Sequence, residues 1–184
     1  MDRPHLAMTA FLFLLPGGVF FGGARIMSMI SGPHTVQGQT PLNMRWFGYD
    51  AKSVSGYWGT LESAERSAEQ RFLKLDLLFP VFYGGALAFS LVTASAMLGE
   101  PAHAGWVIAP VVVTVVADWV ENLVQLNQLR NFIERGAEGL AAGWIQLAST
   151  ATIVKLIFFS LSGLTLVTLL TLVVIKIMST KSVQ

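Results

Sequence analysis

The sequence predicts an all-α integral membrane protein, a bundle of four spanning helices with an interfacial loop and an amphipathic helix between the first two spans. Of its 184 residues, 53% are hydrophobic and only 12% are charged, whereas an ordinary soluble domain has about 25% charged residues. Four long stretches are nearly free of charge, and each can cross a hydrocarbon core about 30 Å thick as a helix. The apolar runs are continuous rather than alternating, which favours helices over a β-barrel.

The composition excludes several classes of protein. So few charged residues cannot cover the surface of a soluble domain, and the hydrophobic content excludes intrinsic disorder. A net charge of +1 gives no electrostatic reason to expect nucleic acid as a partner. The chain has no cysteine, which excludes disulfides and thiolate chemistry. No nucleotide-binding, metalloprotease or hydrolase motif is present. The sequence therefore names no catalytic residue and does not decide whether the protein is an enzyme.

The charge-free stretches place the spans at residues 6–30, 75–98, 104–126 and 144–175, within one membrane domain covering residues 1–184. The first span could be read as a signal peptide, but its apolar run is longer than the core of such a peptide. Gly18 and Gly22 in this span have a spacing that allows close helix approach. We expect them to pack inside the bundle, with a homodimer face as the alternative.

Lysine and arginine residues predict the orientation. With four spans, residues 33–74 and 127–143 lie on one side, called side B here, and both termini lie on the other. Side B carries seven of these residues and the other side three: Arg45, Lys52, Arg66, Arg71, Lys74, Arg130 and Arg135 against Arg3, Lys176 and Lys181. Because cytoplasmic loops are enriched in Lys and Arg, side B is predicted to be cytoplasmic and both termini outside. The segments LDLLFPVFYG and ADWVEN are typical of bacterial multi-pass proteins, so we expect a bacterial inner membrane.

Between the first two spans, residues 32–59 are rich in glycine and proline and are predicted to form an irregular loop. Its aromatic residues are expected at the level of the lipid headgroups: Trp46, Phe47, Tyr49, Tyr57 and Trp58. The loop would lie on the membrane surface or, alternatively, cover a pocket on side B.

From Thr60 the spacing becomes helical and predicts an amphipathic helix that runs into the second span. Its apolar stripe consists of Leu61, Ala64, Ala68, Phe72 and Leu75. Glu62 and Arg66 are expected to pair across one turn.

The third span carries the most informative signal. Asp118, Glu121, Asn122 and Gln125 lie at positions i, i+3, i+4 and i+7, which share one face of a helix. Because charge within hydrocarbon is costly, this face should look into the bundle. If the span begins near Ala104, Asp118 lies roughly 21 Å along it, in the half of the membrane nearer side B.

Polar residues of the other spans are predicted at matching depths. Asp76 and Tyr83 belong to the start of the second span, Arg25 to the end of the first and Lys155 to the start of the fourth. We expect one polar pocket in the side-B half, formed by Arg25, Asp76, Tyr83, Asp118, Glu121, Asn122, Gln125 and Lys155. Among these candidates, the favoured interpretation of Lys155 is that it extends to the interface. Arg25 is expected to act as an interface anchor or as the partner of a carboxylate rather than as a ligand of a substrate.

Two functions fit this pattern. In the first, the protein is a non-catalytic subunit or interaction module, and the polar cluster fixes helix packing. In the second, it is a lipid-directed enzyme or a small ion or solute carrier. In that case Asp76, Asp118 and Glu121 are candidate ligands of a divalent cation, or one of them carries a proton. No other cofactor is implied. Membrane lipids are the expected partners, and a homo-oligomer or a larger membrane complex remains an alternative.

Overall fold

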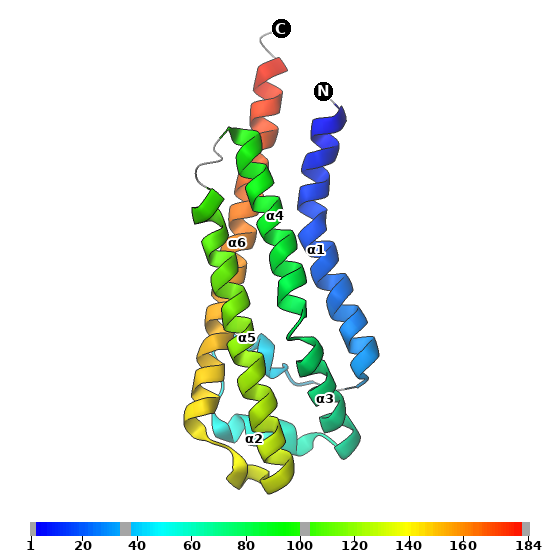
Figure 1. Cartoon of the computed structure of the whole chain (residues 1–184), viewed down its shortest axis with the longest axis vertical. Coiled ribbons are helices and arrows are strands. Elements are labelled where there is room, and N and C mark those ends of the chain that lie inside the picture. Colours follow the sequence, from blue (N-terminus) through cyan, green and yellow to red (C-terminus); the bar gives the residue numbers. More distant parts are fainter. Residues whose placement is uncertain (1–2, 34–37, 100–103, 182–184) are drawn as a thin grey trace.

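The long helices of the chain lie side by side, and both described ends lie at the same end of the bundle (Figure 1). The computed structural model describes residues 3–33, 38–99 and 104–181, which form helices and turns without a strand. The α-helices are α1 (Arg3–Ser31), α2 (Ala51–Thr60), α3 (Ser63–Leu75), α4 (Phe79–Leu98), α5 (Ala104–Arg135) and α6 (Ala142–Lys181). Two short 3₁₀ turns are η1 (Leu42–Met44) and η3 (Gly136–Gly139).

Within the described residues, four helical segments are long and apolar enough to cross a membrane: Ala7–Ser31, Ser63–Leu98, Gly105–Gly139 and Ala142–Ser179. This confirms the predicted all-α fold with four spans. The helices α2 and α3 lie at the opposite end of the bundle from the termini, which is side B (Figure 1). A turn at residues 76–78 separates α3 from α4. The next helix restarts with Pro80 in its first turn, where a missing N–H is tolerated.

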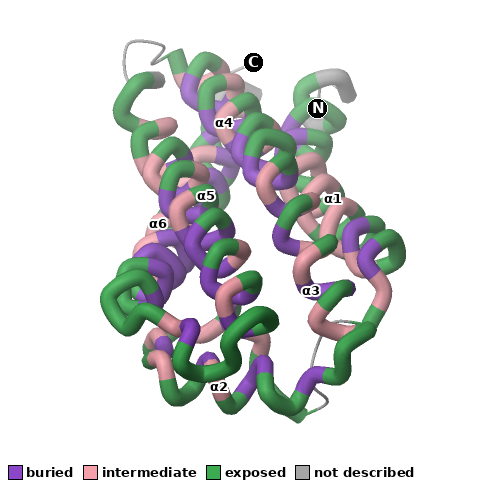
Figure 2. Tube along the Cα trace, turned by 60° about the horizontal axis from the view of Figure 1, so that its bottom comes forward, coloured by how far each residue is buried: buried purple, intermediate pink, exposed green. Residues whose placement is uncertain are grey.

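The bundle is held together by aliphatic residues from all four long helices. One core cluster joins Leu12 of α1, Leu91 of α4, Val111 of α5 and Leu170 of α6. Gly84 allows α4 and α5 to approach closely, because a Cβ at this position would lie 2.5 Å from Val115. Buried residues follow the inward faces of α4, α5 and α6, as Figure 2 shows from the side-B end.

The prediction that Gly18 and Gly22 pack inside the bundle is wrong. Both are exposed, and a Cβ at either position would have no neighbouring atom within 4 Å. The reason is rotation about the helix axis. The face of α1 that packs on α4 carries Phe20 and Met27, and at about 100° per residue both glycines point the opposite way.

The prediction of an irregular loop over residues 32–59 is wrong for its last part, which forms α2. Asp50 caps this helix by accepting hydrogen bonds from the Ser53 main-chain N–H at 2.7 Å and from the Ser53 hydroxyl at 2.6 Å. One face of α2 is buried, including Val54 and Trp58. Capping and burial together outweigh the low helix propensity of the glycines in this segment.

The aromatic residues before and within α2 do not share one environment. Trp46 and Phe47 are exposed, whereas Tyr49, Tyr57 and Trp58 are buried inside the protein, so those three do not present their rings to lipid. They belong to a second core cluster with residues of α5 and α6. The ring centroids of Trp58 and Phe132, for example, lie 5.9 Å apart.

Helix α3 differs from the predicted amphipathic pattern. It begins at a capping box in which Glu62 and Glu65 each accept from the other's main-chain N–H, and the Arg66 Nε donates to the Leu61 carbonyl. The expected pair of Glu62 and Arg66 is not among the described ion pairs. Ala64 of the predicted stripe is exposed, while Glu69 is buried.

Candidate functional site: a buried polar network in the side-B half

The polar stripe of α5 lies entirely inside the bundle. Asp118, Glu121, Asn122 and Gln125 are at most 3% exposed, so the helix turns the whole row toward α4 and α6. Two of the contacts run along the helix itself. The Asn122 amide donates to Asp118 Oδ1 at 3.1 Å, and the Gln125 amide donates to Glu121 Oε1 at 3.0 Å. These two contacts join residues one turn apart on α5 and involve no other helix.

Lys155 of α6 is the central cation of the network. Its Nζ lies 3.2 Å from Asp118 Oδ1 and 2.5 Å from Glu121 Oε2, and the residue is only 8% exposed. Lys155 therefore points into the bundle and does not extend to the interface. Lys176 does lie at the far end of α6, where it donates to the carbonyls of Met97 and Leu98.

The second span contributes to the network from the opposite side. The Tyr83 hydroxyl donates to Asp118 Oδ2 at 2.7 Å, and the Asn122 amide donates to the main-chain oxygen of Asp76 at 3.1 Å. Tyr83 also packs against the ring of Phe159 of α6. Each Asp118 carboxylate oxygen thus has a donor from another helix, Tyr83 on α4 or Lys155 on α6.

Tyr49, which the sequence did not predict as part of the site, completes the network at its side-B end. The Tyr49 hydroxyl accepts from the Gln125 amide at 2.8 Å and lies 3.2 Å from Thr152 Oγ1. Because the Thr152 hydroxyl donates to the Ala148 carbonyl, Tyr49 is the donor to Thr152. Burial, and next the nearby Glu121 carboxylate, raise the pKa of Tyr49 above its usual range. Its hydroxyl therefore remains a hydrogen-bond donor well beyond neutral pH.

The backbone at Gly48 and Tyr49 lies close to α6. The Tyr49 main-chain N–H donates to Ser149 Oγ at 2.8 Å. The preceding Gly48 has a φ of +74°, and a Cβ there would lie 2.5 Å from Ser149 Oγ. One signal was present in the sequence: Ser149, Thr152 and Lys155 recur every third residue, which places polar groups along one side of α6.

Seven of the eight residues predicted to converge lie in or against this network. They are Asp76, Tyr83, Asp118, Glu121, Asn122, Gln125 and Lys155. Arg25 does not join it, because it is exposed and makes no ion pair with another described residue. At 100° per residue it points away from the α1 face that packs on α4.

The candidate divalent cation site is not formed. Within residues 3–33, 38–99 and 104–181, no three acidic or histidine side chains lie close enough together to hold a metal ion. The ammonium of Lys155 occupies the position between Asp118 and Glu121 that a cation would need. Asp76, Asp118 and Glu121 provide three carboxyl groups against this single ammonium.

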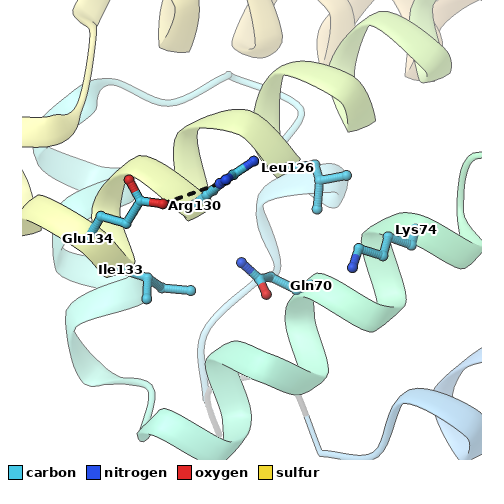
Figure 3. Close-up of a pocket in the computed structure, with 6 residues that line it drawn as sticks. All are labelled: Gln70, Lys74, Leu126, Arg130, Ile133 and Glu134. Carbon is cyan, nitrogen blue, oxygen red and sulfur yellow. Dashed lines mark hydrogen bonds and ion pairs between the residues drawn. The ribbon is translucent and has the colours of Figure 1, made fainter.

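Two pockets reach the network without including Asp76 or Asp118, and a third lies outside it. An apolar pocket of about 220 Å³ between α1, α4 and α6 reaches Tyr83, and a pocket of about 180 Å³ under η1 reaches Gln125. A groove of about 420 Å³ between α3 and α5 is lined by Gln70, Lys74, Leu126, Arg130, Ile133 and Glu134. Figure 3 shows the Arg130–Glu134 ion pair (3.2 Å) on its rim. None of the groove's lining residues belongs to the buried network.

No known protein guides the assignment of this site. Comparison of the chain with protein-family models, with curated proteins and with solved structures found no match in any of the three.

Proposed function

We propose that the protein is a non-catalytic membrane subunit or interaction module, in which the buried network locks the helices of the bundle in register. The observation that carries this proposal is the position of Lys155, whose ammonium is paired with both Asp118 and Glu121. A cation or substrate approaching these carboxylates would have to displace that ammonium. Occupation by an internal partner supports a structural role.

The connections of the network support the same role. Asp118 and Glu121 of α5 are joined to α4 through Tyr83, to α6 through Lys155 and, by way of Gln125, to the segment before α2 through Tyr49. Single polar contacts between membrane helices contribute only about 1 kcal/mol each. Several contacts that share the same buried groups specify one register more strongly, because each group lost leaves others without a partner.

A partner would find the freest surface on α1. Only 11% of its most apolar window is buried, compared with 44% for the span containing α4 and 39% for the span containing α5. Gly18 and Gly22 are exposed on this helix, and small residues at this spacing favour close helix packing. A second copy of the chain or a helix of a larger complex fits this face, with membrane lipids around the rest.

The proposed location is the inner membrane of a bacterium, with side B in the cytoplasm and both termini outside. The distribution of Lys and Arg supports this orientation. Both described ends of the chain lie at the same end of the bundle (Figure 1), which supports placing both termini on one side of the membrane.

The Asp118→Asn variant tests the structural proposal. We expect a lower thermal midpoint in detergent, because Lys155 and Tyr83 lose their charged partner, with no change in the lipids or cations that co-purify. Glu138→Gln, an exposed substitution on the same side, is the control. Unchanged stability together with loss of a co-purifying lipid or cation would contradict the proposal.

A second candidate function is a small carrier of protons or cations, or an enzyme acting on lipids. The excess of three carboxyl groups over one ammonium favours it, since a fully ionised cluster would carry two more negative than positive charges. Vesicles containing the purified protein and a pH-sensitive dye test the proton carrier. Proton flux that is lost in Asp118→Asn but kept in Glu138→Gln would favour this function over the first.

A further inference from the structure

A partly enclosed pocket of about 180 Å³ lies on side B, next to the end of the network. It is formed by the segment around η1, one face of α3 and one residue of α5. The lining residues are Pro41, Asn43, Met44, Glu69, Phe72, Leu73 and Gln125.

The distinctive group in this pocket is the carboxyl of Glu69. The residue is only 6% exposed, yet no hydrogen bond or ion pair joins its side chain to another residue in the described part of the chain. Its acidic neighbour is Asp76, which repels a second negative charge. Its carboxyl oxygens are not among the fully buried polar atoms that lack a partner, and the residue lines the pocket. The carboxyl is therefore accessible from the pocket, where a positively charged group from outside the chain can pair with it.

Gln125 adds a second acceptor to the pocket. Its amide nitrogen donates to Glu121 Oε1 and to the Tyr49 hydroxyl. This fixes which end of the amide faces the network, and it leaves the side-chain oxygen of Gln125 without a hydrogen bond to any described residue. A carboxylate and an amide oxygen therefore line the pocket as free acceptors, which complements a ligand rich in N–H donors.

The other residues that line the pocket favour an organic cation over a metal ion. Four apolar residues (Pro41, Met44, Phe72 and Leu73) outnumber the residues with polar side chains. Calcium takes about six to eight oxygen ligands, and magnesium requires near-octahedral coordination, which this lining does not offer. An organic cation can place its ammonium at Glu69 and its carbon atoms against Met44 and Phe72, where the ring face also attracts positive charge.

We propose that this pocket binds the primary ammonium group of a small organic amine or of an aminophospholipid headgroup, with Glu69 as the ionic partner and Gln125 as a hydrogen-bond acceptor. The pocket lies on the side where α3 enters the membrane, so both sources of the group reach it. The site is separate from the Lys155 pairing and does not depend on the function proposed for the network.

The test uses the full chain in nanodiscs of phosphatidylcholine and phosphatidylglycerol. In one arm, ethanolamine is titrated by calorimetry. In the other, phosphatidylethanolamine is added to the nanodiscs, and its retention relative to phosphatidylcholine is measured by native mass spectrometry. We expect Glu69→Gln to weaken binding of at least one probe by about tenfold or more, since it removes a charge-assisted hydrogen bond. Glu138→Gln, which keeps Glu69, is expected to bind as the unchanged protein does.

Binding of ethanolamine alone identifies a free amine as the ligand, retention of phosphatidylethanolamine alone identifies a lipid headgroup, and either result with loss in Glu69→Gln supports the proposal. If neither probe binds, or Glu69→Gln binds both as well as the unchanged protein, the proposal is wrong. Met44→Trp is the second variant, because it fills the pocket from a residue that is 51% exposed and keeps the carboxyl. If Glu69→Gln does not fold, unchanged binding by Met44→Trp overturns the proposal and lost binding supports it.

Discussion

At the scale of single residues, the charge of Lys155 is central to the network. Asp118 and Glu121 are almost completely buried and both face the same ammonium. Removing one member of a buried ion pair is far more harmful than removing a surface charge, because the remaining charge is left without a partner in a medium of low dielectric constant.

Lys155→Met is therefore expected to lower the free energy of unfolding by about 3–5 kcal/mol. Unfolding of the purified protein in mixed micelles measures this loss, and Lys74→Met, which removes an exposed lysine from side B, is the control. Combining Lys155→Met with Glu121→Gln should recover part of the loss. Equal effects of Lys155→Met and Lys74→Met would show that the pairing does not stabilise the fold.

Tyr49→Phe isolates the contribution of the hydroxyl group that joins the segment before α2 to the network. The substitution keeps the ring but leaves Gln125 and Thr152 without this partner. We expect a loss of about 1–3 kcal/mol in the same unfolding measurement. Phe47→Tyr, at a fully exposed neighbouring position, should change nothing, and a Tyr49→Phe protein as stable as the unchanged one would contradict the assignment.

At the scale of elements, α2 depends on its N-cap. Hydrogen bonds from the Ser53 hydroxyl and main-chain N–H lower the pKa of Asp50. A group whose pKa is lower in the folded than in the unfolded state stabilises the fold above its unfolded pKa, and this contribution disappears as the pH falls through the folded value. The cap is thus fully effective at neutral pH and weakens below the ordinary aspartate value of 3.8.

Asp50→Ala should expose the amides of α2 to faster hydrogen exchange at pH 7, and the difference from the unchanged protein should shrink in acid below that value. Asp50→Asn is the matched control, because asparagine also caps helices but does not titrate. The exchange rates are first corrected for the intrinsic exchange at each pH. If the corrected protection of α2 in the unchanged protein is the same at neutral pH and below the ordinary aspartate value of 3.8, Asp50 does not act as a charged cap.

The connection from η1 to α2 depends on Gly48. Its φ of +74° is in the left-handed region, where a residue with a Cβ is strained by about 1–2 kcal/mol. The added Cβ would also meet Ser149 Oγ at 2.5 Å. Gly48→Ala should therefore destabilise the protein by more than the conformational strain alone, as measured by thermal unfolding. Ser149→Ala removes the atom that the added Cβ would meet, but it also removes the acceptor of the Tyr49 main-chain N–H. The reference is therefore Ser149→Ala alone, against which Gly48→Ala/Ser149→Ala should lose about the conformational part only.

At the scale of the whole molecule, the four spans place α3 and the end of α6 on opposite sides of the membrane. Because the chain has no cysteine, single cysteines report their own side without background. We expect Met178→Cys, in the last turns of α6, to react with a membrane-impermeant maleimide added to intact cells. Ser67→Cys, on the exposed face of α3, should react only after permeabilisation. The reverse pattern would place side B outside.

The sequence was informative where one helix fixes the geometry by itself. The i, i+3, i+4, i+7 spacing put Asp118, Glu121, Asn122 and Gln125 on one face, and the cost of burying charge turned that face inward. The helical position of Tyr83 in the second span then matched it to Asp118, and the two side chains are hydrogen-bonded in the structure. These inferences needed no knowledge of neighbouring helices.

The sequence was uninformative where rotation or a distant contact decides the outcome. Arg25 was expected in the polar pocket, yet it is exposed on the face of α1 that points away from α4. Tyr49 was expected among headgroups, but a contact with Ser149, one hundred positions away, holds it inside. Glu69 lies on a short helix where a charged residue predicts exposure, and it is buried because the η1 segment and α5 close over it.

Hydrophobic length and residue spacing predicted four apolar helices long enough to span a membrane and one inward polar face on α5, because helical rise and periodicity are local quantities. The rotation of α1, the burial of α2, the pairing of Lys155 with two carboxylates and the unpaired Glu69 became known from the three-dimensional structure. These features depend on contacts between segments far apart in the chain, and a local pattern constrains such contacts only when burial leaves a single favourable arrangement.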